Sequence, residues 1–419
     1  MAAIPRILII APHGSYRTAP FIEAAHQLGV PVLIASDEGR HSLVSEYARG
    51  LHLDPRDVES ALPLIREEAE RRGPFSAVIG TDDGTVELAA AAARAFDLPH
   101  NPPEALRLSR RKDLARERLQ QAGIPKPAHR LIDLRESLVA QAAHVDYPAV
   151  VKPLALSASR GVIRVDNAAG FVQACERVER MLACEPHLDP YLRQHLLVEQ
   201  FVPGEEVAVE GMLYNGRLQI LALFDKPDPL NGPFFEETYY ITPGRIAPAQ
   251  QERLTEVIQA TCEAYGLREG PIHAECRVNG PDVWVLEVAA RTIGGMCGRL
   301  LQFGTGRSLE QLVLQHAMNR PPAIDPLSAG AGVLMIPIPR GGVFKRVEGL
   351  LQARRVPYIE EISIQIREGY EVVPLPEGAS YLGFIFARAP DADRAEQALR
   401  DAHACLEIVI DPLIQVHVA

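Results

Sequence analysis

Hydrophobic and polar positions along the first hundred residues follow two alternating patterns. Short apolar runs, typical of buried strands, alternate with longer segments in which apolar residues recur every three or four positions, as in helices. The predicted strands are 7–11, 32–35 and 77–80, and the predicted helices are about 19–28, 58–71 and 85–96. This order predicts a parallel sheet with helices on its faces, and the ligands of such sheets lie beyond the carboxyl ends of the strands.

Two loops that follow predicted strands, 12–17 and 81–84, are therefore candidate ligand loops. Neither contains GxGxxG, and GxxxxGK[ST] occurs nowhere in the chain. A Rossmann dinucleotide site or a Walker-type ATPase would lack its phosphate loop here.

The middle of the chain, after Asn101-Pro102-Pro103, changes to a mixture of helices and hairpins. The predicted helices are about 112–122, 248–265 and 308–319, and the predicted strands are 148–153, 162–165, 196–202, 207–214 and 217–224. The last two strands meet at Asn215-Gly216, a strong hairpin turn. The small-residue loop 157–161, with Lys152 at its root, can fold over a phosphate chain, although such loops are more often plain connections. The Pro- and Gly-rich segment 225–244 is predicted to be a long loop that acts as a lid.

The last hundred residues, after Arg320-Pro321-Pro322, predict a small α+β domain. Its strands are 332–338, 362–366, 383–387 and 406–409, and its helix is about 393–404. No catalytic motif is apparent there, so this domain is expected to buttress the others and to cover the substrate.

Two acidic residues, Glu275 and Glu287, lie on the arms of a predicted hairpin that is followed by Arg291. Alternation assigns Ala274, Cys276, Val278, Trp284, Leu286 and Val288 to the core face and His273, Glu275, Arg277, Val285, Glu287, Ala289 and Arg291 to the opposite face. A three-residue turn at 280–282 pairs Arg277 with Val285. It also places Glu275 across from Glu287, with Cβ atoms roughly 5 Å apart. A turn one residue shorter would put the two acids on opposite faces.

Facing carboxylates repel each other unless a cation neutralises them. A divalent cation bound by oxygen ligands does so, and Mg²⁺ that holds nucleotide phosphates is the common case. The alternative from this hairpin alone is a pair of solvated acids that form ion pairs with Arg277 and Arg291.

Composition excludes several other classes of protein. The chain has 419 residues, too many for one ordinary core, and a net charge of −11 with no Lys/Arg block, so nucleic acid is not an expected partner. Its six cysteines lack CxxC or CxxxC spacing, so the sequence indicates neither a disulfide framework nor a zinc site. The apolar run 7–10 is too short for a signal peptide or membrane span. The expected location is the cytoplasm, with no membrane partner.

An ordered series of residues resembles the ATP-grasp superfamily over about residues 1–320. The series consists of Lys112, Lys152, the loop 157–161, Glu199 to Glu206, Glu275, Glu287 and Arg291. Within the superfamily, His273-Ala-Glu275, then Leu-Glu287-Val-Ala-Ala-Arg291-x-x-Gly-Gly295 and the later Pro339-Arg340-Gly341-Gly342 are most like the L-amino-acid ligases. Those enzymes join two amino acids, or an amino acid and another amine, at the expense of ATP.

The resemblance implies an α/β protein with the ATP-grasp fold. Its expected parts are an N-terminal parallel α/β (pre-ATP-grasp) domain at 1–100, a two-lobed α+β ATP-grasp region at 101–320, and a small C-terminal α+β domain at 321–419. The small lobe would span about 112–200 and the large lobe about 201–320. The expected activity is ATP-dependent carboxylate–amine ligation through an acyl phosphate. The expected partners are small-molecule carboxylate and amine substrates, in particular amino acids.

The resemblance also implies roles for individual residues. Lys112 and Lys152 would bind the nucleotide phosphates, beneath a mobile loop that contains Ser157, Ser159 and Gly161. Glu199, Gln200, Phe201 and Val202 would edge the adenine, and Glu206 would hold the ribose. Glu275 and Glu287 would bind one or two Mg²⁺ ions, with Mn²⁺ as a substitute, and Arg291 would face the transferred phosphoryl group. Many relatives have an asparagine as a further metal ligand where this chain has Ala289, which leaves a second ion open.

Substrate contacts are less sharply indicated. Glu236 and Glu237 are candidates for binding a substrate ammonium group, against the alternative of solvated loop charges. Arg291, Gly294 and Gly295 are further candidates for substrate binding. Arg299 is a candidate for binding a substrate carboxylate, although it could instead cap its helix. His273 would orient substrate or assist a proton transfer, or be a structural histidine.

Two alternative functions stay open from the sequence. One is a purine-pathway or biotin-carboxylase-like enzyme that phosphorylates formate or bicarbonate. The other is a nucleotide-binding regulator without catalysis. The sequence does not determine which carboxylate and amine are used, the biological pathway, or the oligomeric state, although a homodimer is one expectation from relatives.

Overall fold

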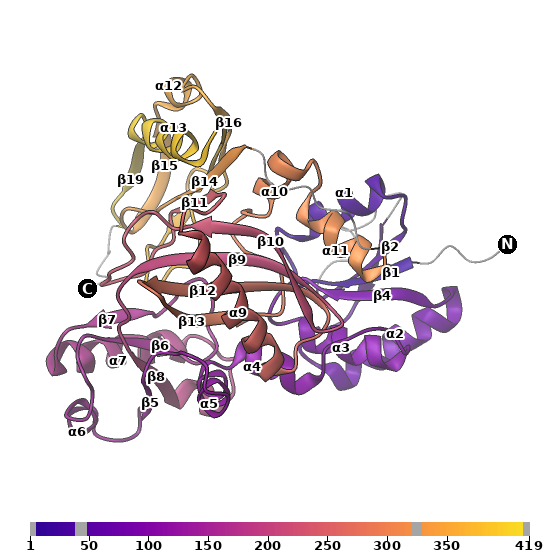
Figure 1. Ribbon diagram of the computed structural model, residues 1–419, viewed down its shortest axis with the longest axis horizontal. Helices are drawn as coiled ribbons and strands as arrows, with labels where there is room; N and C mark the ends of the chain where they lie inside the picture. Colours follow the sequence, from indigo (N-terminus) through magenta and orange to yellow (C-terminus); the bar gives the residue numbers. More distant parts are fainter. Residues whose placement is uncertain (1–5, 38–47, 321–328, 414–419) are drawn as a thin grey trace, which may run out of the picture.

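The N-terminal part of the chain forms a parallel sheet with helices on both faces (Figure 1). A computed structural model describes residues 6–37, 48–320 and 329–413. The strand order of this sheet is β3-β2-β1-β4. Its elements are β1 (Arg6–Ile10), α1 (Thr18–Gln27), β2 (Val32–Ser36), β3 (Ala48–His52), α2 (Val58–Arg72), β4 (Phe75–Gly80) and α3 (Val86–Ala95). Buried residues of β1 belong to a separate core on each face, which explains its continuous apolar run.

A four-stranded antiparallel sheet with the order β5-β8-β6-β7 follows in the chain. The elements of this part are α4 (Pro103–Arg110), α5 (Lys112–Gln121), β5 (His129–Asp133), α6 (Leu138–Ala142), β6 (Ala149–Pro153), β7 (Ile163–Val165), α7 (Ala168–Ala183), α8 (Pro190–Gln194) and β8 (His195–Gln200). The sequence analysis placed no helix at α7. Its buried residues Phe171, Ala174, Cys175 and Val178 recur at helical spacing, so the pattern of the sequence could have predicted this helix.

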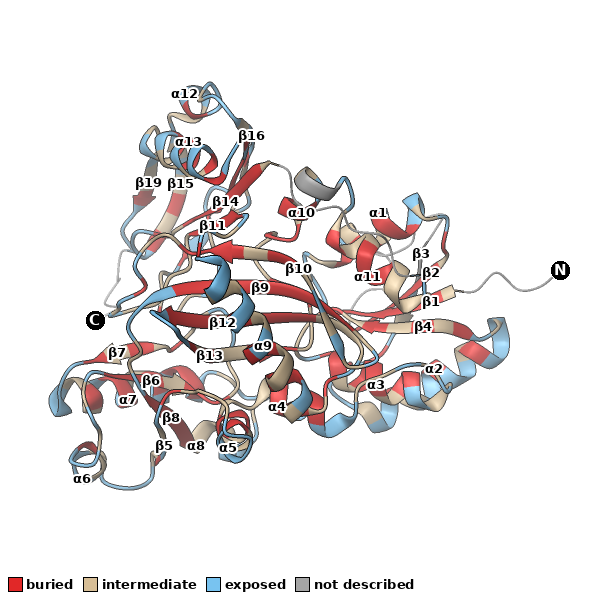
Figure 2. Ribbon diagram, in the orientation of Figure 1, coloured by how far each residue is buried: buried red, intermediate tan, exposed pale blue. Residues whose placement is uncertain are grey.

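An eight-stranded sheet forms the centre of the molecule, with the order β13-β12-β9-β10-β11-β14-β18-β16. The elements of this part are β9 (Glu205–Tyr214), β10 (Arg217–Asp225), β11 (Tyr239–Thr242), α9 (Pro248–Tyr265), β12 (Gly270–Asn279), β13 (Asp282–Ala289), α10 (Arg299–Thr305), α11 (Leu309–Ala317), β14 (Gly330–Ile336), β16 (Ile359–Ile364) and β18 (Gly383–Ala389). Strand β11 lies inside the segment 225–244, which therefore is not one continuous loop as predicted. Most of β9 and β12 is buried (Figure 2).

The remaining C-terminal elements form a three-stranded sheet with the order β17-β15-β19 and two helices. They are β15 (Gly342–Glu348), α12 (Leu350–Ala353), β17 (Glu371–Val372), α13 (Ala392–Ala404) and β19 (Glu407–Asp411). One hydrophobic core joins Ile9 of the first sheet to Met212 of β9 and Phe386 of β18. The domain bounds given above stay predictions, and Pro321 and Pro322 at one of them lie outside the described residues. Among the described helices, none has both the length and the apolar character needed to cross a membrane.

The hairpin of β12 and β13 places Glu275 opposite Glu287, but in a different way from the predicted one. The turn contains only Gly280 and Pro281, because Asn279 pairs with Asp282. Arg277 therefore pairs with Trp284, and the predicted pairing with Val285 is wrong. A register shift between Glu275 and Cys276 then compensates for the shorter turn and brings the two acids back into register.

This shift also corrects the predicted faces of β13. Val285 is fully buried in the core beside Ala274 and Cys276, although alternation placed it on the opposite face. Leu286, predicted to face the core, instead lines the large cavity described below, next to Glu287. The prediction failed because strict alternation cannot anticipate a bulge.

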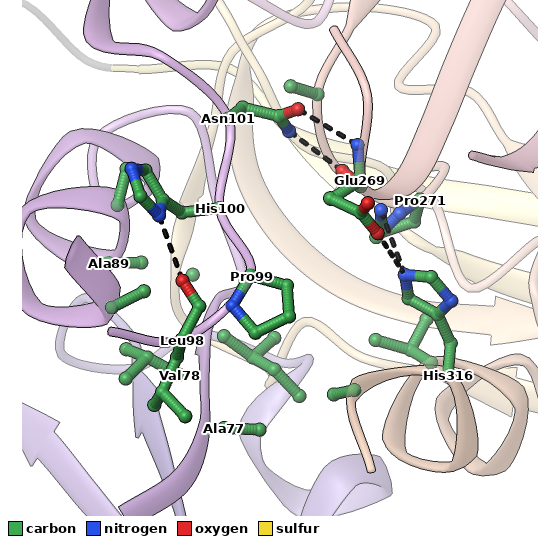
Figure 3. A pocket seen from close by; sticks show the side chains of 18 of the residues that line it. Ala77, Val78, Ala89, Leu98, Pro99, His100, Asn101, Glu269, Pro271 and His316 are labelled. Carbon is green, nitrogen blue, oxygen red and sulfur yellow. Dashed lines mark hydrogen bonds and ion pairs between the residues drawn. The ribbon is translucent and has the colours of Figure 1, made fainter. Parts of the chain in front are cut away.

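A cavity of about 530 Å³ lies between the first sheet and the start of β12 (Figure 3). His316 of α11 lines it, and its Nε2 atom accepts a hydrogen bond of 3.0 Å from the backbone N–H of Gly270. Burial lowers the pKa of His316 to about 4. A carboxylate oxygen of Glu269 lies 3.5 Å from the same Nε2 atom. The folded protein therefore favours the neutral imidazole of His316.

The stability of the protein should consequently depend on pH through His316. Between about pH 6.5 and pH 4 the unfolded histidine binds a proton that the folded one does not. As the pH is lowered through this window, the free energy of unfolding should therefore fall by on the order of 1–3 kcal/mol. In urea unfolding curves, His316→Gln should remove this part of the pH dependence, whereas His144→Gln, at an exposed position, should keep it. Parallel pH profiles for the native protein and His316→Gln would contradict the assignment.

Candidate functional site

A cavity of about 650 Å³ brings together side chains from the four-stranded antiparallel sheet, from the eight-stranded sheet and from loops that follow strands of the first sheet. Sixteen of the residues proposed from the sequence line it: Lys112, Lys152, Ser157, Ser159, Glu199, Gln200, Phe201, Val202, Glu206, Glu237, His273, Glu275, Glu287, Arg291, Gly294 and Gly295. A volume of this size is in the range of sites for small molecules and cofactors. The structure thus assembles into one place residues that are far apart in the sequence.

Three of the proposed residues, Gly161, Glu236 and Arg299, do not line this cavity. The backbone N–H of Gly161 donates a hydrogen bond of 3.0 Å to the carbonyl oxygen of Pro376. The Arg299 guanidinium lies 2.7 Å from a carboxylate oxygen of Glu361 and packs on an aromatic ring. These contacts give Gly161 and Arg299 structural partners outside the cavity.

The two lysines proposed for phosphate binding each contact an acidic residue of the site. Lys112 Nζ lies 3.2 Å from Glu287 Oε2 and donates a hydrogen bond of 3.0 Å to the carbonyl oxygen of Leu156. Lys152 Nζ, at the end of β6, lies 2.6 Å from Glu199 Oε2. Both ammonium groups therefore reach the cavity from two different elements, and Lys112 also contacts the chain at the start of the Ser/Gly loop.

Glu199 is buried and bound by a second cation that sequence analysis missed, Arg116 of α5. Burial raises the pKa of Glu199, but the charges of Arg116 and Lys152 outweigh it and lower the pKa to about 2. Arg116 also donates a hydrogen bond to the carbonyl oxygen of Leu286. Its position one helical turn after Lys112 places both side chains on the same face of α5, a spacing that could have identified it.

Lys226, which follows β10, is a buried lysine that the sequence analysis also missed. Its ammonium group contacts Glu206, Glu237 and Glu275, at 2.9, 2.5 and 3.1 Å. Burial lowers the pKa of Lys226, but the charges of Glu237 and Glu275 raise it well above its usual value. Burial, followed by the charge of Glu275, raises the pKa of Glu237 to about 7.

His273 lies between two acidic residues. Its Nε2 atom is 3.4 Å from Glu275 Oε1, and its Nδ1 atom is 3.4 Å from Glu210 Oε2. Burial lowers the pKa of His273, but the hydrogen bonds to Glu210 and Glu275 outweigh this effect. The pKa of His273 is therefore raised above its usual value. Glu210 is fully buried on β9, directly opposite His273 in the register, and accepts a hydrogen bond of 3.1 Å from the backbone N–H of Ile293.

Glu275 and Glu287 together have the properties of ligands for a hard divalent cation. Both line the cavity from adjacent positions of paired strands, and both offer carboxylate oxygens. Glu287 contacts the Lys112 ammonium, and Glu275 contacts the Lys226 ammonium. Burial raises the pKa of Glu275, but the charge of Lys226 lowers it well below its usual value, so this carboxylate is ionised. A facing pair of carboxylates of this kind fits Mg²⁺.

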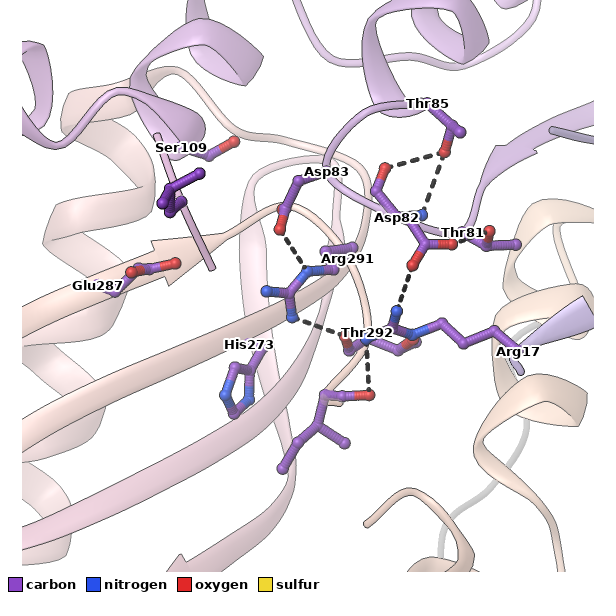
Figure 4. Close-up of polar contacts among 12 residues, drawn as sticks. Arg17, Thr81, Asp82, Asp83, Thr85, Ser109, His273, Glu287, Arg291 and Thr292 are labelled. Atoms are coloured by element: carbon purple, nitrogen blue, oxygen red, sulfur yellow. Dashed lines mark hydrogen bonds and ion pairs between the residues drawn. The ribbon is translucent and has the colours of Figure 1, made fainter. Parts of the chain in front are cut away.

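Arg291, which follows the strand that carries Glu287, contacts a loop of the first sheet (Figure 4). Its Nε atom lies 3.0 Å from Oδ2 of Asp83, in the loop after β4. Burial lowers the pKa of Arg291, but the charges of Asp83 and Glu287 outweigh this effect and raise it. Asp82, next in the same loop, forms an ion pair with Arg17 from the loop after β1. Both predicted ligand loops therefore reach the cavity.

The double glycine after Arg291 contacts the same N-terminal loop. The backbone N–H of Gly295 donates a hydrogen bond of 3.0 Å to the hydroxyl oxygen of Tyr16. From the C-terminal part of the chain, Met335, Gln365 and Tyr381 also line the cavity. The cavity is therefore enclosed by parts of all three domains expected from the sequence.

Comparison with known families identifies two domains in the chain. Residues 145–299 match the ATP-grasp domain, and residues 334–411 match the L-amino acid ligase C-terminal domain 2. The first match contains the acid pair and Arg291, and the second contains β15, β18 and α13.

Similar proteins agree with these matches. Carnosine synthase 1 from Homo sapiens is 27% identical over 289 residues, which cover 65% of this chain and 35% of that protein, so the chain spans about a third of that relative's length. The uncharacterized protein y4rH from Sinorhizobium fredii is 24% identical over 98% of the chain and 84% of its own length. The crystal structure of an L-amino acid ligase from Bacillus licheniformis has a TM-score of 0.80 and 26% identity, over 97% of this chain and 99% of that one. The chain therefore contains an ATP-grasp domain and an L-amino acid ligase C-terminal domain 2, and it is similar to ATP-grasp ligases that form carbon–nitrogen bonds, among them the L-amino-acid ligases.

Proposed function

We propose that this chain is an ATP-dependent carboxylate–amine ligase that forms an amide or dipeptide bond through an acyl phosphate and releases ADP and phosphate. The observation that carries the proposal is the single cavity in which two lysines, the acid pair and Arg291 meet the loops of the first sheet. We propose the domain bounds that were expected from the sequence. The cytoplasmic location and the homodimer also remain predictions.

ATP would lie along the part of the cavity formed by β6, β8 and the start of β9. Lys112 and Lys152 would bind its phosphates, and their present acid partners, Glu287 and Glu199, show that both ammonium groups are positioned by charge. The segment from Glu199 to Val202 would edge the adenine. Glu206, which lines the same wall, would accept hydrogen bonds from the ribose hydroxyls.

Glu275 and Glu287 would hold Mg²⁺, with Mn²⁺ as a substitute. When bound, the ion would supply positive charge next to the nucleotide phosphates. The remaining cations come from the chain itself, because Lys152 of β6 and Arg291, which follows β13, both line the cavity.

The chemistry would proceed in two transfers. A carboxylate is a poor electrophile, so its oxygen first attacks the γ-phosphorus of ATP, the bond to ADP breaks, and an acyl phosphate forms. The amine nitrogen then attacks the acyl carbon, the carbon–oxygen bond to phosphate breaks, and a proton is lost from nitrogen. Arg291 would stabilise the charge of the transferred phosphoryl group in both steps.

Water must be kept from the acyl phosphate, and the loops around the cavity are suited to this task. The Ser/Gly loop contacts the C-terminal part of the chain through Gly161 and Pro376. A second contact is the ion pair between Arg177 of α7 and Glu377, at 2.6 Å. Closure of the cavity would therefore involve the C-terminal domain as well as the Ser/Gly loop.

Amino acids fit the charges of the cavity better than formate or bicarbonate do. An amino acid carries an ammonium group, for which Glu237 and Asp83 are candidate partners, and a carboxylate, for which Arg17 and Arg291 are candidates. Solved structures of N5-carboxyaminoimidazole ribonucleotide synthetase and biotin carboxylase also resemble this chain, at 15–17% identity, which shows the common fold alone.

Substrate pairs separate the candidate functions. We expect phosphate release from ATP to require an amino acid, to rise when a second amino acid or another amine is added, and to be accompanied by a product with one new amide bond. The measurement is a phosphate-release screen with product identification by mass spectrometry. Release with formate or bicarbonate alone would support the purine-pathway or biotin-carboxylase-like alternative. Nucleotide binding without turnover in any mixture would support the regulator.

The acid pair provides the second test. Glu287→Gln keeps the size of the side chain but removes its charge, so amide formation should fall by about 100-fold or more. Asp282→Asn at the exposed start of the same strand is the matched control and should retain native turnover. Circular dichroism and thermal unfolding should show that both variants fold. Native amide formation by Glu287→Gln would contradict the metal assignment.

A further inference from the structure

Lys226 occupies an unusual position among three acidic residues of the proposed site. Its side chain is 2% exposed, and its Nζ atom lies within 3.1 Å of an oxygen from each of Glu206, Glu237 and Glu275. These carboxylates come from β9, from the segment before β11 and from β12. One ammonium group therefore connects three separate elements at the floor of the cavity.

The location of Lys226 separates it from the other cations of the site. Glu206, Glu237 and Glu275 all line the cavity, but Lys226 does not. Lys226 thus lies behind the acids, where a substrate in the cavity meets the carboxylates first. It is a positioning residue that acts through them, in contrast to Lys152 and Arg291, which line the cavity themselves.

The three carboxylates could form a cation site of their own. One oxygen from each lies within 4.8 Å of the others, a spacing that suits three ligands of one metal ion. The ammonium group of Lys226 contacts all three of these acids, so it occupies the position in which such an ion would balance their charge. Lysine is a compact point charge with three donors, and here it donates to one oxygen of each acid.

Other cations do not replace this contribution. Arg277 Nε binds Glu206 at 2.9 Å, and His273 contacts Glu275 at 3.4 Å. Glu237 has no further cation within ion-pair distance among the described residues, and it otherwise accepts a hydrogen bond of 2.7 Å from the Tyr240 hydroxyl. Without Lys226, three acids would share the floor of the cavity with a cation for only two of them.

We propose that Lys226 is a built-in counter-ion that occupies the cage formed by Glu206, Glu237 and Glu275 and thereby excludes a divalent ion from it. Glu275 then remains available for the metal that it shares with Glu287, and Glu206 remains available for the ribose. The inference rests on the proposed function for the roles of these acids. The Lys226 ammonium would thereby restrict divalent ions to the site formed by Glu275 and Glu287.

The test is Mn²⁺ binding without nucleotide, measured by electron paramagnetic resonance on the full chain. Lys226→Met removes the charge and keeps the approximate length of the side chain, so it should gain one Mn²⁺ site that binds at least tenfold more tightly than any site of the native protein. Lys345→Met, at a partly exposed lysine paired with Asp411, is the matched control and should bind Mn²⁺ as the native protein does. Lys226→Met/Glu237→Gln, with one acid fewer, should lose the gained site.

Stability gives an independent measurement if Lys226→Met folds poorly. Mn²⁺ should then restore its thermal midpoint without ATP, and by more than it shifts the midpoint of the native protein, because an ion that binds only the folded cage stabilises it. Unchanged Mn²⁺ affinity in a folded Lys226→Met, or no stabilisation of a poorly folded one, would overturn the counter-ion role. Because neither measurement uses turnover, failure of the ligase assay with every substrate pair would leave this result standing and contradict only the proposed function.

Discussion

The structure around the cavity depends on two like charges that the fold forces together, Glu275 and Glu287 on paired strands. Such a pair is unfavourable unless cations surround it. The cations come from distant parts of the chain, with Lys112 on Glu287 and both Lys226 and His273 on Glu275. Charge compensation therefore connects α5, the end of β10 and β12 in one place. The same requirement is consistent with the proposed binding of a divalent ion and a polyphosphate in this cavity.

The sequence predicted this acid pair and most of the elements around it, but not the route by which the pair forms. The helix 248–265 and the hairpin at Asn215-Gly216 follow from periodicity and turn chemistry, and the structure confirms them. The hairpin turn at Gly280-Pro281 is shorter than predicted, and a bulge beside Glu275 restores the register. A bulge arises from the packing of both faces of the sheet, which no local pattern reports.

Candidate residues at strand ends and in loops were predicted because charged or small side chains stand out there. The missed residues, Arg116, Glu210 and Lys226, are buried charges whose partners lie far away in the sequence. In the sequence, Glu210 is a single polar position within an apolar strand. The structure shows that it lies opposite His273 in the neighbouring strand. Lys226 gains its meaning from Glu206, Glu237 and Glu275, which only the sheet order brings together. Such residues require three-dimensional neighbours to be recognised.

Buried ion pairs are a poor source of stability, because each charge must first be taken out of water. A chain that buries Arg116 with Glu199, and Lys226 with three acids, accepts that cost at one side of one cavity. Hydrophobic residues of similar volume would pack there at least as well. What the charges provide is fixed electrostatics, since each carboxylate is held in place by a cation before any ligand arrives. The network therefore gives the cavity a fixed arrangement of charges at some expense to stability, as the proposed polyphosphate and cation chemistry would require.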